Sequence, residues 1–221
     1  MTPAEVLTGL LRSDPTSPRI TCYDDGTGER IELSGKVLAN WVSKAANLLQ
    51  DELDAGPGTT VALHLPADHW RTYYWALAAW SVGAHLTTTD APSDIAVGIT
   101  ADGSGETEIV VTLAALARRA TSDVPAGGID EARELSSYGD VFVPYRTPVD
   151  ADPALDDTLY ADLVVVGGAL RRRVQVTGDL THALREALAV WADDGSVVLL
   201  RDVRPEDVDR RLTTEGAAPR P

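Results

Sequence analysis

The residues of this chain best suited to chemistry lie in the stretch 166–173, which reads Val-Gly-Gly-Ala-Leu-Arg-Arg-Arg. The apolar residues 163–166 lead into it and predict a fully buried strand. A glycine turn after a strand can direct backbone N–H groups toward an anion, and a nearby guanidinium can neutralise a phosphate or carboxylate. Gly167, Gly168 and Arg171 are therefore the candidate cofactor-binding residues. The alternative is a solvated basic turn, which the sequence favours because the stretch contains no hydroxyl, proline or lysine.

Two other polar motifs have an ordinary structural explanation. Gly103-Ser104-Gly105 follows a predicted strand, but Glu108 stands where a dinucleotide fingerprint has its third glycine, so we interpret the motif as a turn. The aspartates of the loop 148–157 fail the EF-hand spacing, because Leu155 stands where glycine is required. We interpret this loop as a solvated acidic segment, and we assign no metal site.

Histidine and cysteine also fail to make a catalytic pattern. His64 and His85 are expected on neighbouring strands as packed, hydrogen-bonded side chains, with a general base as the alternative. Cys22 has no evident activating base, and as the lone cysteine it excludes an internal disulfide. No catalytic residue is assigned from these positions.

Composition excludes several classes of partner. The chain has 221 residues and a net charge of −15, which argues against nucleic acid and anionic membrane surfaces and leaves a basic partner as an alternative. Neither a membrane-spanning apolar run nor a signal sequence is recognisable, so we predict a cytoplasmic protein. Only two of the 19 basic Lys and Arg residues are lysines, which indicates the codon bias of a high-GC bacterial genome.

Apolar periodicity and turn residues predict an α/β fold, with a mainly parallel sheet flanked by helices and an N-terminal β-hairpin. We expect one domain over 1–215, an internal boundary near 148–158, and a disordered tail over 216–221. The hairpin is predicted over 19–33. Further strands are predicted over 61–65, 84–88, 95–99, 108–112, 141–143, 163–166 and 197–200. Helices are predicted from residue 2, and over 34–53, 68–82, 113–120, 180–191 and 204–214.

The predicted helix 68–82 carries more aromatic residues than one buried face requires. Its large apolar side chains span nearly the whole circumference, which indicates an exposed patch and therefore a homo-oligomer or a protein partner. The alternative is that a second layer of the same chain covers them.

Several motifs occur in the order found in one superfamily. Leu33-Ser34 opens a helix containing Ala45-Ala46-Asn47-Leu48, and Gly56-Pro57-Gly58 precedes an apolar strand. The segment 76–86 leads from a helix into a strand, and 194–200 is an apolar strand followed by Arg204-Pro205-Glu206. Over about half of its length the chain resembles the N-terminal part of the acyl-adenylate-forming superfamily, which includes the acyl-CoA synthetases.

The resemblance stops where that superfamily does its chemistry. Its phosphate loop is rich in Ser, Thr and Gly and ends in Pro-Lys-Gly, whereas the nearest text here is 166–173. We find no counterpart of its adenine- and ribose-binding segment or of its catalytic lysine, so no catalytic residue is carried over. The resemblance therefore implies a degenerate, non-catalytic binding or assembly protein that needs no cofactor. The alternative is a ligase-type enzyme, or a nucleotide- or acyl-binding protein, that binds ATP or AMP through a rebuilt loop.

Overall fold

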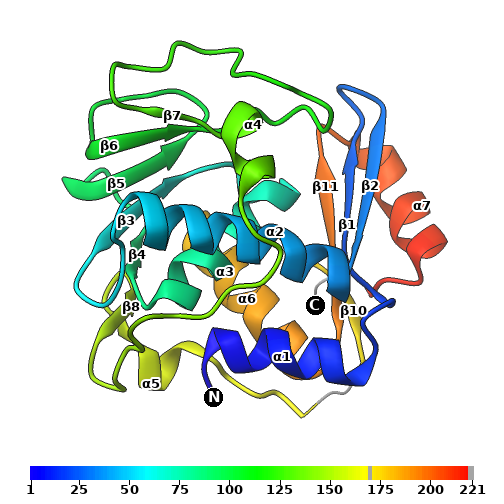
Figure 1. Cartoon of the computed structure of the whole chain (residues 1–221). Coiled ribbons are helices and arrows are strands. Elements are labelled where there is room, and N and C mark those ends of the chain that lie inside the picture. The colour runs from blue at the N-terminus through cyan, green and yellow to red at the C-terminus, as the bar shows by residue number, and fades with distance from the viewer. Residues whose placement is uncertain (169–170, 219–221) are drawn as a thin grey trace. The chain divides into compact units, whose positions relative to one another are not determined.

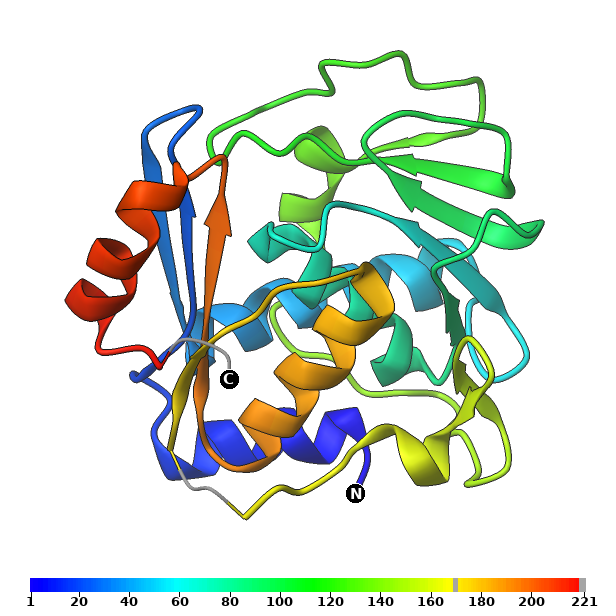
Figure 2. The same ribbon diagram turned by 180° about the vertical axis from the view of Figure 1, so that it is seen from behind.

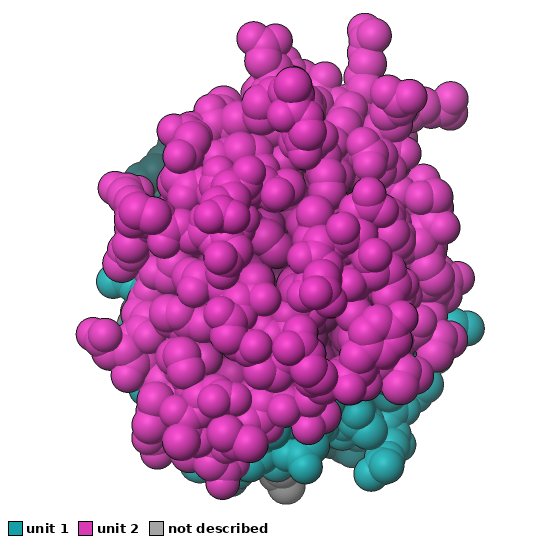
Figure 3. Space-filling model, turned by 60° about the vertical axis from the view of Figure 1, so that its left-hand side comes forward, with its two compact units in different colours: residues 1–39, 66–70, 164–221 teal, residues 40–65, 71–163 magenta. Residues whose placement is uncertain are grey.

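The structure is a computed structural model that describes residues 1–168 and 171–218 (Figure 1). The chain divides into two compact units, which Figure 3 distinguishes by colour. Unit 1 comprises Met1–Ala39, Pro66–Trp70 and Val164–Pro221, and unit 2 comprises Asn40–Leu65 and Arg71–Leu163. The last division follows Leu163, beyond the range 148–158 in which the sequence predicts a boundary.

Unit 1 is built on a four-stranded sheet in the order β10-β11-β1-β2. The expected N-terminal hairpin is β1 (Pro18–Asp24) with β2 (Glu29–Ser34), and β1 also pairs in parallel with β11 (Ser196–Arg201). The edge strand β10 (Arg173–Gln175) runs parallel to β11. Figure 2 shows α7 (Pro205–Glu215) on one face of this sheet and α6 (Leu180–Ala192) on the other. Helix α1 (Pro3–Ser13) packs against α6 and begins with the predicted capping box of Thr2 and Glu5.

Unit 2 is built on a seven-stranded sheet in the order β7-β6-β5-β3-β4-β8-β9. Every pairing is parallel except that of the last two strands. The strands are β3 (Thr60–His64), β4 (His85–Thr87), β5 (Ser93–Gly98), β6 (Gly105–Val110), β7 (Ile129–Asp130), β8 (Pro153–Leu155) and β9 (Thr158–Leu159). The predicted fold class, a mainly parallel α/β fold with an N-terminal hairpin, is confirmed.

The helical elements of unit 2 connect these strands. Helix α2 (Gly35–Asn47), which begins in unit 1, continues as one π-helical segment, η1 (Leu48–Glu52). The others are α3 (Trp70–Val82), α4 (Glu131–Glu134), the 3₁₀ segment η2 (Leu135–Ser137) and α5 (Tyr160–Leu163). No helix in the described part of the chain is long and apolar enough to cross a bilayer.

Helix α3 is buried around its whole circumference, which corrects the expectation of an exposed aromatic patch. Trp70, Tyr73, Tyr74, Trp75 and Trp80 are all buried. Trp41 stacks on Tyr74 at 5.5 Å between ring centroids, and the indole of Trp80 donates to the carbonyl of Ala154. Other segments of the same chain therefore cover these rings, as the alternative interpretation stated. The buried rings no longer support the predicted self-association, which stays a prediction.

Three predicted elements are absent from the described structure. Leu163 ends α5, and the residues after it form no strand, with Val165 and Val166 58% and 56% exposed. Residues 141–143 form no strand, and 113–120 form no helix. A short apolar run does not by itself distinguish a strand from a loop, because a strand also needs a partner strand. The edge of β11 is occupied by β10 and not by residues 163–166.

The C-terminal end is ordered further than predicted. Gly216 closes α7 in a left-handed conformation, Ala217 is buried, and the N–H of Ala218 bonds to the carbonyl of Arg173 at 2.9 Å. The remainder of the predicted disordered tail, 219–221, lies outside the described residues.

Candidate functional site

The predicted glycine turn follows α5 and lies beside the end of α6. Asp193 is the C-terminal cap residue of α6 and is buried. Its carboxylate accepts the N–H of Gly167 through Oδ2 and the N–H of Gly168 through Oδ1, both at 3.1 Å. These amides are the donors that an anion would need at this turn. In this chain an internal carboxylate occupies them. Residues 169 and 170 of the predicted stretch lie outside the described residues.

Arg171 belongs to the same locality but directs its side chain to another aspartate. Its backbone N–H donates to the carbonyl of Asp193 at 2.8 Å, and its φ is +59°. Its Nε donates to Oδ2 of Asp194 at 3.0 Å, while the side chain is 75% exposed. The structure therefore brings Gly167, Gly168 and Arg171 together, and each meets a carboxyl or carbonyl group of the α6–β11 turn.

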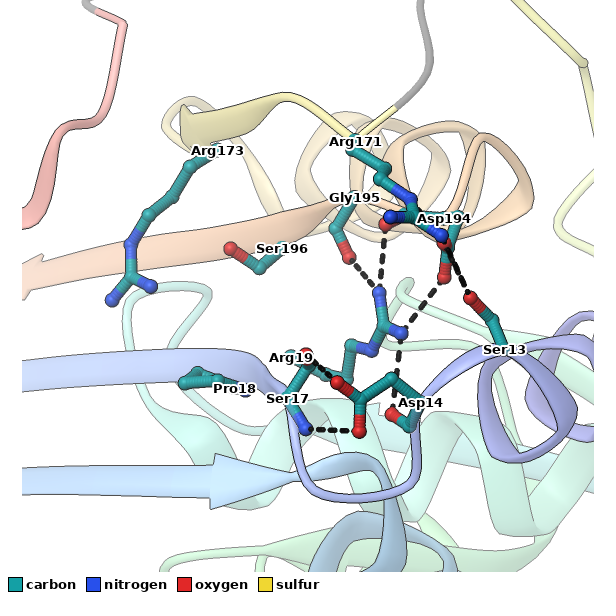
Figure 4. Close-up of a pocket in the computed structure, with 10 residues that line it drawn as sticks. All are labelled: Ser13, Asp14, Ser17, Pro18, Arg19, Arg171, Arg173, Asp194, Gly195 and Ser196. Carbon is teal, nitrogen blue, oxygen red and sulfur yellow. Dashed lines mark hydrogen bonds and ion pairs between the residues drawn. The ribbon is translucent and has the colours of Figure 1, made fainter.

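Arg171 also lines a pocket of about 270 Å³ in unit 1, drawn in Figure 4. The pocket lies where β1, β10 and β11 begin and where α1 and α6 end. Helix C-termini present unpaired carbonyls and partial negative charge, which arginine side chains satisfy well. The lining residues are Ser13, Asp14, Ser17, Pro18, Arg19, Arg171, Arg173, Asp194, Gly195 and Ser196.

The arginines of this pocket are bonded to groups of the chain itself. Buried Arg19 donates to the carbonyls of Asp194 and Gly195 at 2.7 and 3.2 Å and pairs with the Asp194 carboxylate at 2.8 Å (Figure 4). Arg173 donates to the hydroxyl of Thr21 at 2.6 Å and pairs with Glu215. The geometry is that of arginines stabilising helix ends and neighbouring carboxylates.

Both aspartates of the pocket are held in the ionised form. Partial burial acts to raise the pKa of Asp194, but hydrogen bonds from Ser13 and Arg19, together with the charge of Arg19, bring it below its ordinary value. Hydrogen bonds from Ser17 and Thr16 lower the pKa of Asp14. An entering anion would therefore meet two negative carboxylates as well as the guanidiniums.

The second glycine motif repeats the arrangement of the first. The N–H groups of Gly103 and Gly105 both donate to Oε1 of Glu108, at 2.9 and 3.2 Å. Glu108 is buried and belongs to β6. The interpretation as a turn therefore gains a physical reason, since a carboxylate three to five residues downstream satisfies its donors. A glutamate this close in sequence to the glycines can be recognised as their acceptor from the sequence. The separation of 26 residues between Gly167 and Asp193 gives no such indication.

The histidines lie on strands, as predicted, but do not meet. Residue pairing places His85 beside Thr60, so His64 and His85 lie at opposite ends of the adjacent strands β3 and β4. His64 contacts a carboxylate oxygen of Asp102 at 2.9 Å and the carbonyl of Thr89 at 3.3 Å. His85 contacts the carbonyl of Asp156 at 3.0 Å. Each imidazole is thus a hydrogen-bonded packing residue.

Cys22 and a buried charged cluster complete the set of ionisable groups. Burial raises the pKa of the Cys22 thiol to about 12, which makes it a poor nucleophile. In unit 2, Arg71 pairs with Glu131 at 2.8 Å, and Tyr74 donates to the same carboxylate oxygen at 2.5 Å. Burial raises the pKa of Glu131 despite the nearby charge of Arg71. Sequence analysis missed this cluster because its members are up to 60 residues apart.

Comparison with known proteins gives a relative of similar length and several structures of similar fold. No family model matches the chain. A TIGR03089 family protein of Mycobacterium tuberculosis is 38% identical over 229 residues, covering 95% of this chain and 93% of that protein. An acyl-CoA synthetase of Brucella canis superposes with a TM-score of 0.73 at 14% identity, covering 99% of this chain and 46% of the synthetase.

Coronafacic acid ligase of Pectobacterium brasiliense gives a TM-score of 0.69, also at 14% identity, with 99% of this chain and 49% of the ligase covered. The chain therefore spans about half the length of the solved ligases that it matches. The likeness confirms, at the level of the fold, the resemblance that the sequence motifs indicate.

Proposed function

The chain belongs to the TIGR03089 family and folds like the acyl-CoA ligases, and from this premise we propose that it is a non-catalytic binding or assembly protein that forms no acyl-adenylate. One observation carries the proposal. The carboxylate of Asp193 accepts the backbone N–H groups of Gly167 and Gly168. These are the two donors of the turn whose sequence most resembles a phosphate loop.

Electrostatics supports the proposal. A nucleotide phosphate at this turn would have to displace Asp193, because two anions cannot share the same pair of N–H donors. Asp194 and Asp14 lie close by in the pocket of Arg171 and add further negative charge. The chain as a whole carries −15, so no long-range field favours an anionic ligand.

ATP–pyrophosphate exchange with a panel of carboxylic acids tests the proposal. We expect no exchange, and no rise in melting temperature with millimolar ATP or AMP in the presence of magnesium. Exchange or a nucleotide-dependent stabilisation that disappears in Gly168→Ala would overturn it. Gly168 has a φ of +76°, so alanine there strains the turn.

Two aspartate variants distinguish the alternative, a nucleotide-binding protein with a rebuilt loop. If ATP competes with Asp193 for the glycine amides, Asp193→Asn will strengthen nucleotide stabilisation by removing the competing charge. Asp209→Asn is the matched control, because Asp209 is exposed on α7 and its substitution removes the same charge. Under the proposal neither variant responds to ATP or AMP.

A further inference from the structure

His64 differs from His85 in that both of its ring nitrogens face oxygen atoms. Nδ1 lies 2.9 Å from Oδ2 of Asp102, and Nε2 lies 3.3 Å from the carbonyl oxygen of Thr89. Within the described part of the chain, His85 makes one such contact, from Nε2 to the carbonyl of Asp156. A neutral imidazole has one donor nitrogen and one acceptor nitrogen, whereas the imidazolium has two donors. Only the imidazolium form of His64 can therefore hydrogen-bond to both of its partners.

Neither partner of His64 can donate a proton in return. The carbonyl oxygen of Thr89 only accepts hydrogen bonds. The N–H of Ser104 donates to Oδ1 of Asp102 at 2.9 Å, and hydrogen bonding by Ser104 lowers the pKa of Asp102. This carboxyl group is therefore ionised at neutral pH and also only accepts. The side chain of His64 is 17% exposed, so water has little room to replace a lost contact.

Thr89 and Asp102 belong to two short crossover connections of the seven-stranded sheet. Residues 88–92 join β4 to β5, and residues 99–104 join β5 to β6, although these strands run parallel to one another. A crossover between parallel strands normally takes a dozen or more residues and contains a helix. Connections of this length have no helical hydrogen bonds of their own, so contacts with side chains must hold them in place.

The crossover 88–92 is fastened at both ends but exposed between them. The N–H of Thr88 donates to Oδ1 of Asp156, and the N–H of Ser93 donates to the carbonyl of Ser104, both at 2.9 Å. Residues 89–92 between these anchors are exposed. The contact of His64 with the carbonyl of Thr89 therefore acts on the free part of the crossover.

We propose that His64, Asp102 and Thr89 form a pH-sensitive clasp, which holds the crossover 88–92 when His64 is protonated and releases it when His64 is neutral. Histidine changes its charge between about pH 5 and pH 8. When Nε2 gives its proton to solvent, Nδ1–H stays with Asp102, because a hydrogen bond to an ionised acceptor is the stronger one. The lone pair of Nε2 then faces the carbonyl oxygen of Thr89, and the two repel.

The charges around His64 favour its protonated form. The titratable side chains of the neighbouring strands, crossovers and turn are those of His85 on β4, Asp90 and Asp102 in the crossovers, Asp94 on β5, Glu106 and Glu108 on β6, and Asp156 and Asp157 between β8 and β9. His85 lies at the opposite end of its strand, beside Thr60. All the others are acidic, and negative charge stabilises an imidazolium.

NMR spectroscopy of the full chain between about pH 5 and pH 8 tests the clasp. Imidazole ¹⁵N shifts report which ring nitrogens carry a proton, and backbone relaxation reports the motion of the crossover. We expect both nitrogens of His64 to be protonated at the acidic end and only Nδ1 at the basic end. With the same midpoint, the order parameters of Asp90 and Ala91 should fall from about 0.85 to below about 0.6. A crossover equally rigid throughout, or a ring that is neutral at the acidic end, would overturn the proposal.

Three variants assign the effect to His64. His64→Gln cannot take up a proton, so the order parameters of residues 90 and 91 should no longer depend on pH. His85→Gln is the matched control, because it removes a histidine from the adjacent strand and should leave the transition intact. Asp102→Asn removes the negative partner and should move the midpoint to lower pH. An unchanged transition in His64→Gln would overturn the proposal. If that variant does not fold, an unchanged midpoint in Asp102→Asn would do so.

Discussion

Asp193 receives two N–H groups from a turn that lies 25 and 26 residues earlier in the chain. A carboxylate accepts two parallel donors in the way that a phosphate does, so the turn keeps an anion-binding geometry while its anion is part of the protein. Glu108 does the same for Gly103 and Gly105. Two glycine motifs that a sequence can flag for cofactor binding are thus satisfied internally.

Replacing Asp193 by asparagine should therefore destabilise the protein without unfolding it. The amide retains one oxygen for two donors and brings its own N–H groups against one of them, so one of the two part-buried hydrogen bonds from the glycine amides is lost. We expect a loss of about 1–3 kcal/mol in the free energy of unfolding, measured by urea denaturation. Asp209→Asn on exposed α7 should change it by less than about 0.5 kcal/mol. Equal losses of stability in the two variants would mean that the hydrogen bonds to the Asp193 carboxylate do not stabilise the fold.

A second pair of variants measures where the interior of this region ends. Leu163 is fully buried at the end of α5, whereas Val165 is exposed two residues later. Leu163→Asp places an unpaired charge in the interior and should lower the free energy of unfolding by several kcal/mol. Val165→Asp should leave the denaturation midpoint nearly unchanged. A large loss of stability in Val165→Asp would contradict the exposed position of Val165.

Elements with a clear period were predictable, and short apolar runs were not. Strand β3 and helices α2, α3 and α6 lie close to the predicted ranges, because long periodic segments and capping residues specify them locally. The runs 141–143 and 163–166 have the same composition as buried strands but remain outside every sheet. The partner strand decides between the two outcomes, and pairing is not encoded in a window of four residues.

The candidate site was predictable to the same extent. Glycines after an apolar run located the turn, since glycine permits the positive φ found at Gly168. The acceptor Asp193 and the buried pair of Arg71 and Glu131 join positions far apart in sequence. Only the fold brings them together, so no local pattern could name them.

One carboxylate of helix α7 interacts with side chains of three strands of the neighbouring sheet. Glu215 accepts the hydroxyl of Tyr23 at 2.5 Å and pairs with Arg30 at 2.9 Å and with Arg173. Glu215→Gln should lower the free energy of unfolding by about 1–3 kcal/mol at pH 7, because three donors lose a charged acceptor that is nearly buried.

The effect of Glu215→Gln should also depend on pH. Burial acts to raise the pKa of Glu215, but hydrogen bonds from Tyr23 and Arg30 and the charge of Arg173 lower it below its ordinary 4.5. A carboxyl group whose pKa is lowered by folding stabilises the folded state at pH values above its pKa in the unfolded chain. This stabilisation is lost as the pH falls through its pKa in the folded protein. The difference between wild type and variant should therefore shrink below about pH 4.5, as urea titrations from pH 7 to 3 would measure. A difference independent of pH would assign Glu215 a packing role only.

The whole chain combines a retained fold with a charge that opposes association. Each unit keeps its own mainly parallel sheet, and together they match about half of a ligase. The net charge of −15 acts over the entire surface and repels a second copy of the chain. The self-association expected from the sequence, which stays a prediction, must therefore overcome a long-range repulsion that salt can screen.

Raising the ionic strength should strengthen the predicted self-association. The screening length falls from about 10 Å at 0.1 M salt to about 3 Å at 1 M, which removes most of the repulsion between two acidic copies. Exposed ion pairs between two copies would weaken under the same conditions, but such pairs contribute only about 0.2–1 kcal/mol each. Repulsion summed over two charges of −15 is the larger effect.

We therefore expect the dissociation constant for self-association, measured by sedimentation, to fall severalfold between about 0.05 and 0.5 M sodium chloride. A monomer of 23.5 kDa at every salt concentration, or an association that salt weakens, would contradict this prediction.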